Sequence, residues 1–125
     1  MIRKKRILLV DDEADFVELL RNRLEENNFD VIIAYDGEEA LVAVERERPD
    51  LILLDIMLPK MSGFDVCRKL KVDERLKNIP IVMLSAKFQP NDIKFGMAMG
   101  ADGYITKPFE PQVLLEKIRE LLNKE

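Results

Sequence analysis

The chain has 125 residues and a mass of 14.5 kDa, which is the size of one domain and enough to bury a hydrophobic core without disulfides. Hydrophobic residues make up 47% of it and charged residues 35%, a balance that excludes disordered and fibrous chains. Its single cysteine and its lack of histidine exclude an intrachain disulfide, a cysteine-based zinc site and histidine-dependent catalytic triads. The net charge of −4 argues against broad binding of nucleic acid.

The N-terminus carries no recognisable targeting signal. A basic run at residues 3–6 is followed by only four apolar residues before Asp11, which is shorter than the apolar region of a signal peptide. No stretch approaches the ~20 apolar residues that span a bilayer. We therefore expect a cytoplasmic protein that does not bind a membrane.

Short apolar runs and segments of helical spacing alternate along the chain. The runs predict five strands, at residues 7–10, 31–34, 51–54, 81–84 and 104–105. Apolar side chains three and four residues apart predict five helices, around residues 16–24, 40–44, 64–70, 93–99 and 114–122. Strict alternation of this kind predicts an α/β fold with a parallel sheet and right-handed crossovers.

Some helix starts carry local signals. Asp36, with Glu39 three residues later, has the spacing of a capping box, and Pro111 suits the first position of a helix. In the first helix the buried stripe is expected to consist of Phe16, Leu19, Leu20 and Leu24. Residues 87–91 are expected to form a loop.

The helix at 93–99 has an unusual apolar pattern. Ile93, Phe95, Met97 and Met99 alternate, so they cannot all lie on one helical face. We expect some of them to be exposed as part of an interaction surface.

Polar side chains follow four of the five predicted strands. Asp11 and Asp12 follow the first, Asp55 the third, Ser85 the fourth and Lys107 the fifth. The carboxyl ends of parallel strands meet at one edge of the sheet, where ligands of open α/β sheets bind. These side chains should therefore converge.

Three converging carboxylates need compensating positive charge. Two of them ~4 Å apart repel by ~4 kcal/mol at an effective dielectric constant near 20. Lys107 supplies one positive charge, and a hard divalent cation with oxygen ligands is the natural second. The pattern indicates a Mg²⁺ site with room for a phosphoryl group.

The sequence resembles the receiver domain of two-component response regulators. The motifs that carry the resemblance are LLVDDE at 8–13, LLDIMLP at 53–59, MSG at 61–63, LSA at 84–86 and GADGYITKPF at 100–109. The resemblance spans almost the whole chain and implies one receiver domain over residues 1–125. It also implies a flavodoxin-like parallel sheet of order 2-1-3-4-5.

The resemblance implies a role for each acidic site residue. Asp55 would be the phosphoacceptor, taking a phosphoryl group from a phosphohistidine of a sensor histidine kinase. Asp11, Asp12 and Asp55 would hold Mg²⁺ together with the backbone carbonyl of Met57. The domain would be a switch that catalyses only its own phosphorylation and dephosphorylation.

Other residues would bind the phosphoryl group or respond to it. Lys107 would pair with its oxygens, and Ser85 would donate a hydrogen bond, helped by the backbone N–H of Ala86. Tyr104 would rotate on phosphorylation. The surface made of the 93–99 helix, the Tyr104 strand and the last helix would then bind a protein target or a second copy, with no direct contact to nucleic acid.

Several alternatives remain open from the residues alone. Taken singly, Asp12 could cap a helix starting near Ala14, and Tyr104 could be an ordinary half-buried aromatic residue. A Mg²⁺-dependent aspartyl-phosphate phosphatase of the haloacid-dehalogenase type needs an acid two residues after its nucleophile, where this chain has Met57. A flavodoxin-like carrier would have its phosphate repelled by the acidic residues at 11–13. The chain could also be a receiver from a longer regulator with an output domain, or one that works unphosphorylated.

Overall fold

The computed structural model describes residues 3–86 and 89–123, and in them five strands form one parallel sheet. The strands are β1 (Arg6–Val10), β2 (Asp30–Ala34), β3 (Leu51–Asp55), β4 (Ile81–Ser85) and β5 (Gly103–Thr106). Their order across the sheet is β2-β1-β3-β4-β5, with every neighbouring pair parallel. The predicted flavodoxin-like α/β architecture is confirmed.

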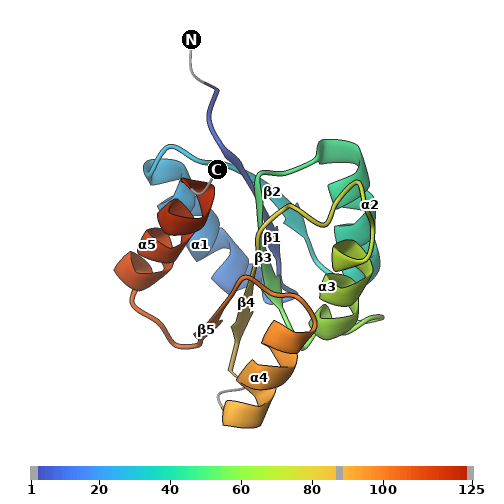
Figure 1. The fold of residues 1–125 in the computed structure, drawn as a ribbon. Coiled ribbons are helices and arrows are strands. Elements are labelled where there is room, and N and C mark those ends of the chain that lie inside the picture. The colour runs from blue at the N-terminus through green and yellow to red at the C-terminus, as the bar shows by residue number, and fades with distance from the viewer. Residues whose placement is uncertain (1–2, 87–88, 124–125) are drawn as a thin grey trace.

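Five helices alternate with the strands and cover both faces of the sheet. They are α1 (Ala14–Glu26), α2 (Gly37–Glu47), α3 (Gly63–Lys71), α4 (Pro90–Ala98) and α5 (Pro111–Leu122). Figure 1 shows α1 and α5 together on one face and α2 and α3 on the other, with α4 near the β5 edge. The central strands β1, β3 and β4 are therefore almost fully buried on both sides, which explains their continuous apolar runs in the sequence.

Alternate residues of the strands belong to two separate hydrophobic clusters. Leu8, Ile52 and Met83 pack with α2 and α3, whereas their neighbours Ile7 and Leu51 pack with α1 and α5. Each of these side chains is fully buried, which contributes ~1.5–3 kcal/mol per residue relative to exposure. The two clusters fix the sheet between its helical layers.

The predicted helix starts at Asp36 and Pro111 agree with the structure. The Glu39 N–H donates to Asp36 Oδ1 at 2.8 Å, and the Glu39 carboxylate accepts from the Tyr35 N–H at 2.9 Å. Pro111 is the first residue of α5. These local signals hold because they depend only on neighbouring residues.

Two local expectations were wrong. Leu19 is 73% exposed, because Val17 takes its expected place beside Leu20 and Leu24 on the buried face. Helix α4 begins at Pro90 rather than at residue 93, since proline is favoured in the first helical turn. The expected loop at residues 87–91 therefore ends before Pro90, and its residues 87–88 lie outside the described residues.

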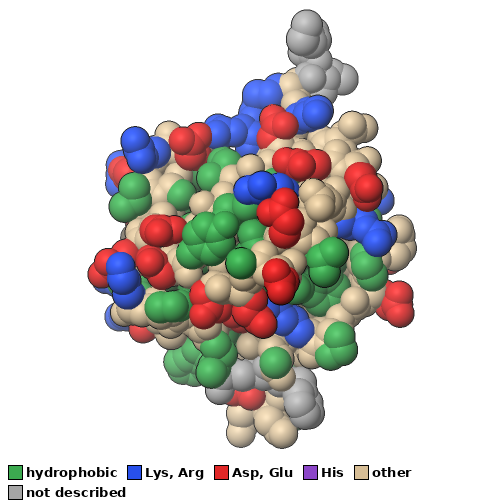
Figure 2. Space-filling model, turned by 180° about the vertical axis from the view of Figure 1, so that it is seen from behind, with side chains coloured by type: hydrophobic (Ala, Val, Ile, Leu, Met, Phe, Trp, Pro, Cys, Tyr) green, Lys and Arg blue, Asp and Glu red, His purple; other side chains and the backbone are tan. Residues whose placement is uncertain are grey.

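The molecular surface mixes charges of both signs. Figure 2 shows acidic and basic side chains interspersed over one face, with hydrophobic side chains visible between them. Within residues 3–86 and 89–123, no helix has both the length and the apolar character that crossing a membrane requires.

Candidate functional site

The strand register brings the polar strand ends to one edge of the sheet. Val10 pairs with Leu54, so Asp11 and Asp55 follow at the same level of neighbouring strands. At β4 and β5, Ser85 pairs with Thr106, which is followed by Lys107. Residues separated by up to 96 positions in the sequence thus meet at the carboxyl end of the sheet.

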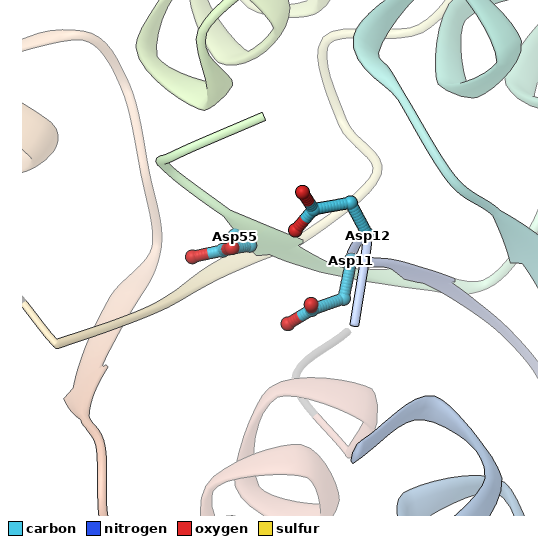
Figure 3. Close-up of side chains that lie close together, drawn as sticks. All are labelled: Asp11, Asp12 and Asp55. Atoms are coloured by element: carbon cyan, nitrogen blue, oxygen red, sulfur yellow. The ribbon is translucent and has the colours of Figure 1, made fainter. Parts of the chain in front are cut away.

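Three carboxylates form the centre of this edge. Asp11 and Asp12 extend from the end of β1 and Asp55 from the end of β3, and Figure 3 shows them side by side. One carboxylate oxygen from each lies within 4.8 Å of the others. Asp11 and Asp55 are buried, whereas Asp12 is exposed. The cluster therefore opens to solvent on the Asp12 side.

Backbone amides orient two of these carboxylates. The Glu13 N–H donates to Asp11 Oδ1, and the Ile56 N–H donates to Asp55 Oδ1, both at 2.9 Å. The possible capping role of Asp12 is not realised, because Glu13 is the N-cap of α1 and no side chain caps this helix. The Asp12 carboxylate instead lies beside those of Asp11 and Asp55.

The ammonium group of Lys107 lies within this anionic cluster. Its Nζ donates to Asp11 Oδ2 at 2.7 Å and lies 4.0 Å from Asp55 Oδ1 and 3.9 Å from Glu13 Oε1. The Lys107 N–H donates to the Ser85 carbonyl at 2.8 Å, and the peptide bond between Lys107 and Pro108 is cis. Lys107 thus supplies one charge against three carboxylates.

The environment of Asp55 opposes its ionisation. The pKa of Asp55 is raised to about 6, chiefly because burial penalises the charged form; the charge of Lys107 lowers the pKa, that of Asp11 raises it, and the amides of Ile56 and Met57 lower it. Desolvation penalises the charged form, and a second carboxylate adds repulsion. A cation at this position would relieve both effects.

The donor set suits a hard divalent cation. It consists of carboxylate oxygens only, two from buried residues and one from an exposed residue. Mg²⁺ and Ca²⁺ prefer such oxygen ligands, and Mg²⁺ typically takes one or two carboxylates and keeps several waters. The acidic triad is therefore consistent with a divalent metal site.

Ser85 and Tyr104 lie next to the acidic cluster and interact with each other. Ser85 is fully buried at the end of β4, and burial raises the pKa of Tyr104 while a hydrogen bond with Ser85 lowers it. The Tyr104 ring also lies against α4, where a Cβ added to Gly96 would come within 3.1 Å of Tyr104 Cδ2. Tyr104 therefore connects the edge of the site to α4.

The two residues whose backbone atoms are expected to bind Mg²⁺ or the phosphoryl group, Met57 and Ala86, lie in loops that follow β3 and β4. Met57 follows β3; its side chain is exposed, and its backbone N–H lies close enough to Asp55 to lower the pKa of that carboxyl. Ala86 follows β4 and is also exposed. Metal binding by the Met57 carbonyl and phosphoryl binding by the Ala86 N–H remain predictions.

The sequence interpretation missed an aromatic contact to Lys107. The Lys107 ammonium lies 4.1 Å from the centroid of the Phe16 ring, and Phe16 and Lys107 line a mostly apolar groove of about 550 Å³ between α1 and the start of α5. The helical spacing of Phe16 predicted core packing alone. No sequence signal relates Phe16 to a lysine 91 positions later, because the contact depends on the packing of α1 against the β5–α5 loop.

The expected surface on α4 is partly exposed. Phe95 and Met97 are 49% and 45% exposed, and Val113 on α5 is similarly accessible. Met99 is more buried and packs against the α2–α3 cluster. A groove of about 500 Å³ joins α4, β5 and α5, with Met97, Tyr104 and Val113 in its lining. The prediction that some apolar residues of this helix face solvent is confirmed.

Comparisons with known proteins agree on one family. Residues 7–119 match a family described as the response regulator receiver domain. The chain is 47% identical over 120 residues to the alkaline phosphatase synthesis transcriptional regulatory protein PhoP of Bacillus subtilis, covering 96% of this chain and 49% of that protein. It is also 47% identical over 121 residues to the DNA-binding response regulator MtrA of Mycobacterium tuberculosis, covering 97% of this chain and 52% of that protein.

The fold comparison leads to the same family. The chemotaxis response regulator CheY4 of Vibrio cholerae superposes with a TM-score of 0.89 at 31% identity, covering 95% of this chain and 99% of that one. The present chain spans about half the length of the curated relatives it matches.

Proposed function

Because the chain belongs to the response regulator receiver domain family, we propose that it accepts a phosphoryl group on Asp55 from the phosphohistidine of a cognate sensor histidine kinase, in a Mg²⁺-dependent reaction. The chain is a phosphoacceptor switch rather than a conventional enzyme. The observation that carries the proposal is the convergence of three carboxylates and one ammonium group at the carboxyl end of the sheet. We also propose that residues 1–125 form a single receiver domain that works in the cytoplasm.

In the proposed transfer, one carboxylate oxygen of Asp55 forms a new P–O bond. The P–N bond of the phosphohistidine breaks, and the imidazole nitrogen keeps its electron pair. The Ile56 N–H that binds Asp55 Oδ1 orients the nucleophile. Since the pKa of Asp55 is about 6, the carboxylate is mostly ionised and nucleophilic at pH 7.

Asp11, Asp12 and Asp55, with the carbonyl of Met57, are the residues that we expect to hold Mg²⁺. When bound, the ion supplies positive charge that offsets the carboxylates and the phosphoryl oxygens. The open side of the site at Asp12 leaves space for water and phosphate ligands.

Lys107 and Ser85 are expected to bind the new phosphoryl group. The Lys107 ammonium already lies 4.0 Å from Asp55 Oδ1, so a phosphoryl group on Asp55 would compete with Asp11 for its hydrogen bonds. The Ser85 hydroxyl would donate to a second phosphoryl oxygen, and the Ala86 N–H would assist.

Tyr104 provides a path from the site to the surface. It hydrogen bonds with Ser85 and lies against Gly96 of α4. A change in the hydrogen bonding of Ser85 would alter the balance between two Tyr104 positions and thereby the surface of α4, β5 and α5. The exposed Phe95, Met97 and Val113 on this surface suit a protein target or a second copy of the chain.

The relatives suggest a second form of output. PhoP is named a transcriptional regulatory protein and MtrA a DNA-binding response regulator, and both are about twice as long as this chain. If this sequence belongs to a longer regulator, the output would be DNA binding by another domain. The receiver itself is still expected to make no direct contact with nucleic acid, in keeping with its net charge of −4.

The test is incubation with acetyl phosphate and Mg²⁺, followed by intact-mass measurement. We expect the chain to gain one phosphoryl group, and we expect neither the Asp55→Asn variant nor the wild type in EDTA to gain it. Asp30→Asn is the matched control, because Asp30 is exposed at the opposite edge of the sheet. Absence of the adduct in the wild type, or its retention in Asp55→Asn, would overturn the proposal.

A further inference from the structure

An aromatic ring lies beside the ammonium group of Lys107. The Nζ atom is 4.1 Å from the centroid of the Phe16 ring, within the ~6 Å range of a cation–π contact. Phe109 meets Phe16 in a T-shaped arrangement, with centroids 6.2 Å apart and planes at 88°. This edge-to-face packing orients the Phe16 ring, since such pairs have a preferred geometry.

The surroundings of Lys107 make this contact stronger than one at an exposed surface. The Lys107 side chain is 16% exposed, and Asp11, its hydrogen-bond partner, is buried. Cation–π attraction increases as the cation loses water. Phe16 is itself partly buried in the cluster formed with α1 and α5, so the ring cannot easily move away.

A ring and a carboxylate act differently on an ammonium group. A carboxylate takes up one of the three N–H donors of lysine, as Asp11 does at 2.7 Å. An aromatic face attracts the charge through its quadrupole and leaves those donors available. Holding the flexible four-carbon stem of lysine in one place costs rotamer entropy, and the attraction to the ring offsets part of this cost.

We propose that Phe16 is a positioning residue for phosphoryl uptake: its ring holds the Lys107 ammonium beside Asp55 without accepting a hydrogen bond as a second carboxylate would, so the N–H donors that Asp11 does not bind can reach the incoming phosphoryl oxygens. This inference rests on the proposed function of Asp55 and Lys107. It adds a residue of α1 to the site and gives the ring an electrostatic role besides its packing.

The experiment changes the electrostatics of the ring at nearly constant size. Phenylalanine at position 16 is replaced by its mono-, di- and trifluorinated forms, and the rate of phosphorylation by acetyl phosphate is measured with Mg²⁺. Each fluorine weakens the negative face of the ring, so the rate should fall stepwise, to about 3- to 10-fold below wild type for the trifluorinated ring. The phosphorylation rate of Phe16→Leu should be lower by a similar factor, and that of Phe16→Tyr should stay near the wild-type rate.

A second measurement uses the protein without metal or phosphoryl donor. The Lys107 Hε resonances should be shifted upfield by the Phe16 ring current in the wild type and Phe16→Tyr, and this shift should disappear in Phe16→Leu. Phe29→Leu is the matched control: Phe29 is buried in the same cluster but lies just before β2, at the opposite edge of the sheet. It should lower stability while leaving both the rate and the Lys107 resonances unchanged.

The outcomes separate this inference from the proposed function. A wild type that takes up no phosphoryl group contradicts the proposed function. A wild type that is phosphorylated at the same rate across the fluorinated series contradicts the role of Phe16 and leaves that of Asp55 intact. A rate that falls equally in Phe29→Leu would show that only packing matters, which also overturns the inference.

Discussion

Lys107 Nζ lies 2.7 Å from Asp11 Oδ2, although 96 residues separate the two in the sequence. The Asp11 side chain is almost fully buried, and Lys107 is only 16% exposed. This pair joins the end of β1 to the end of β5 across β3 and β4. Removing one partner would leave a buried charge without compensation and would therefore lower the free energy of unfolding.

We expect Lys107→Met to destabilise the metal-free protein by about 2 to 3 kcal/mol. Urea unfolding in EDTA would measure the loss. Asp11→Asn in the same background should recover part of it, because the uncompensated charge is then absent. Lys117→Met is the control: Lys117 pairs with Glu120 near the surface, so the free energy of unfolding should change by less than ~1 kcal/mol. If the two lysine variants lost equal free energy of unfolding, the stabilising role of the Lys107–Asp11 pair would be refuted.

The raised pKa of Asp55 predicts how stability depends on pH in the metal-free protein. The pKa is about 6 in the folded state, against 3.8 as the ordinary value, so the folded chain binds the proton more tightly. The protonated group therefore favours folding below about pH 4, and this contribution is lost as the pH rises from about 4 to about 6. The loss amounts to roughly 3 kcal/mol at most.

Asp55→Asn removes this pH dependence. We expect the variant to be more stable than the wild type at pH 7 in EDTA, with the difference shrinking toward pH 4. Urea unfolding of both proteins across this pH range gives the contribution of Asp55 as the difference in their free energies of unfolding, because the other carboxylates titrate in both proteins. A constant difference at all pH values would contradict the expectation.

Magnesium should stabilise the fold through the acidic triad. A ligand that binds only the folded state adds ~2.7 kcal/mol at a concentration of 100 times its Kd. Asp12→Ala should weaken Mg²⁺ binding at least ~10-fold, because it removes one of three carboxylates. It should leave the metal-free stability unchanged or slightly higher, because Asp12 is exposed and its removal relieves repulsion among the carboxylates.

Calorimetric titration with Mg²⁺ and thermal unfolding with and without the ion would measure these effects. Asp15→Ala serves as the control, because Asp15 is exposed in the first turn of α1 and lies outside the triad. If both variants bound Mg²⁺ equally well, the assignment of Asp12 as a ligand would be wrong.

Gly96→Ala should disturb the position of Tyr104. An added Cβ would lie 3.1 and 3.3 Å from Tyr104 Cδ2 and Cε2, closer than ordinary contact. The gain in helix propensity of up to ~1 kcal/mol from glycine to alanine would offset much of the crowding, so stability should change little while the ring is displaced.

Tyrosine fluorescence can report this displacement. The chain has two tyrosines and no tryptophan, so a Tyr35→Phe background leaves Tyr104 as the only emitter. Iodide quenching should increase in Gly96→Ala, and it should not change in Ala98→Gly, which alters an exposed position of the same helix. Unchanged quenching in Gly96→Ala would mean that the ring tolerates the methyl group in place.

Much of the fold could be read from local patterns. The apolar runs at 7–10 and 51–54 are continuous because β1 and β3 are covered on both faces, and strict alternation with helices leaves few topologies. The acidic strand ends could also be anticipated, because parallel strands carry the residues that follow them to one edge. The roles of Asp55, Lys107 and Tyr104 are predictions from the resemblance.

Spacing along the chain is enough to predict the order of the elements, the capping of α2 and the polar residues at the strand ends, because each of these depends on residues that are close in sequence or on the alternation of strands and helices. The packed fold was needed to learn that Leu19 faces solvent, that Phe95 and Met97 are the exposed residues of α4, and that the Phe16 ring contacts the Lys107 ammonium. These features depend on how helices pack against the sheet and against distant loops. Periodicity shows that a helix has an apolar face, but it does not show which neighbour that face meets.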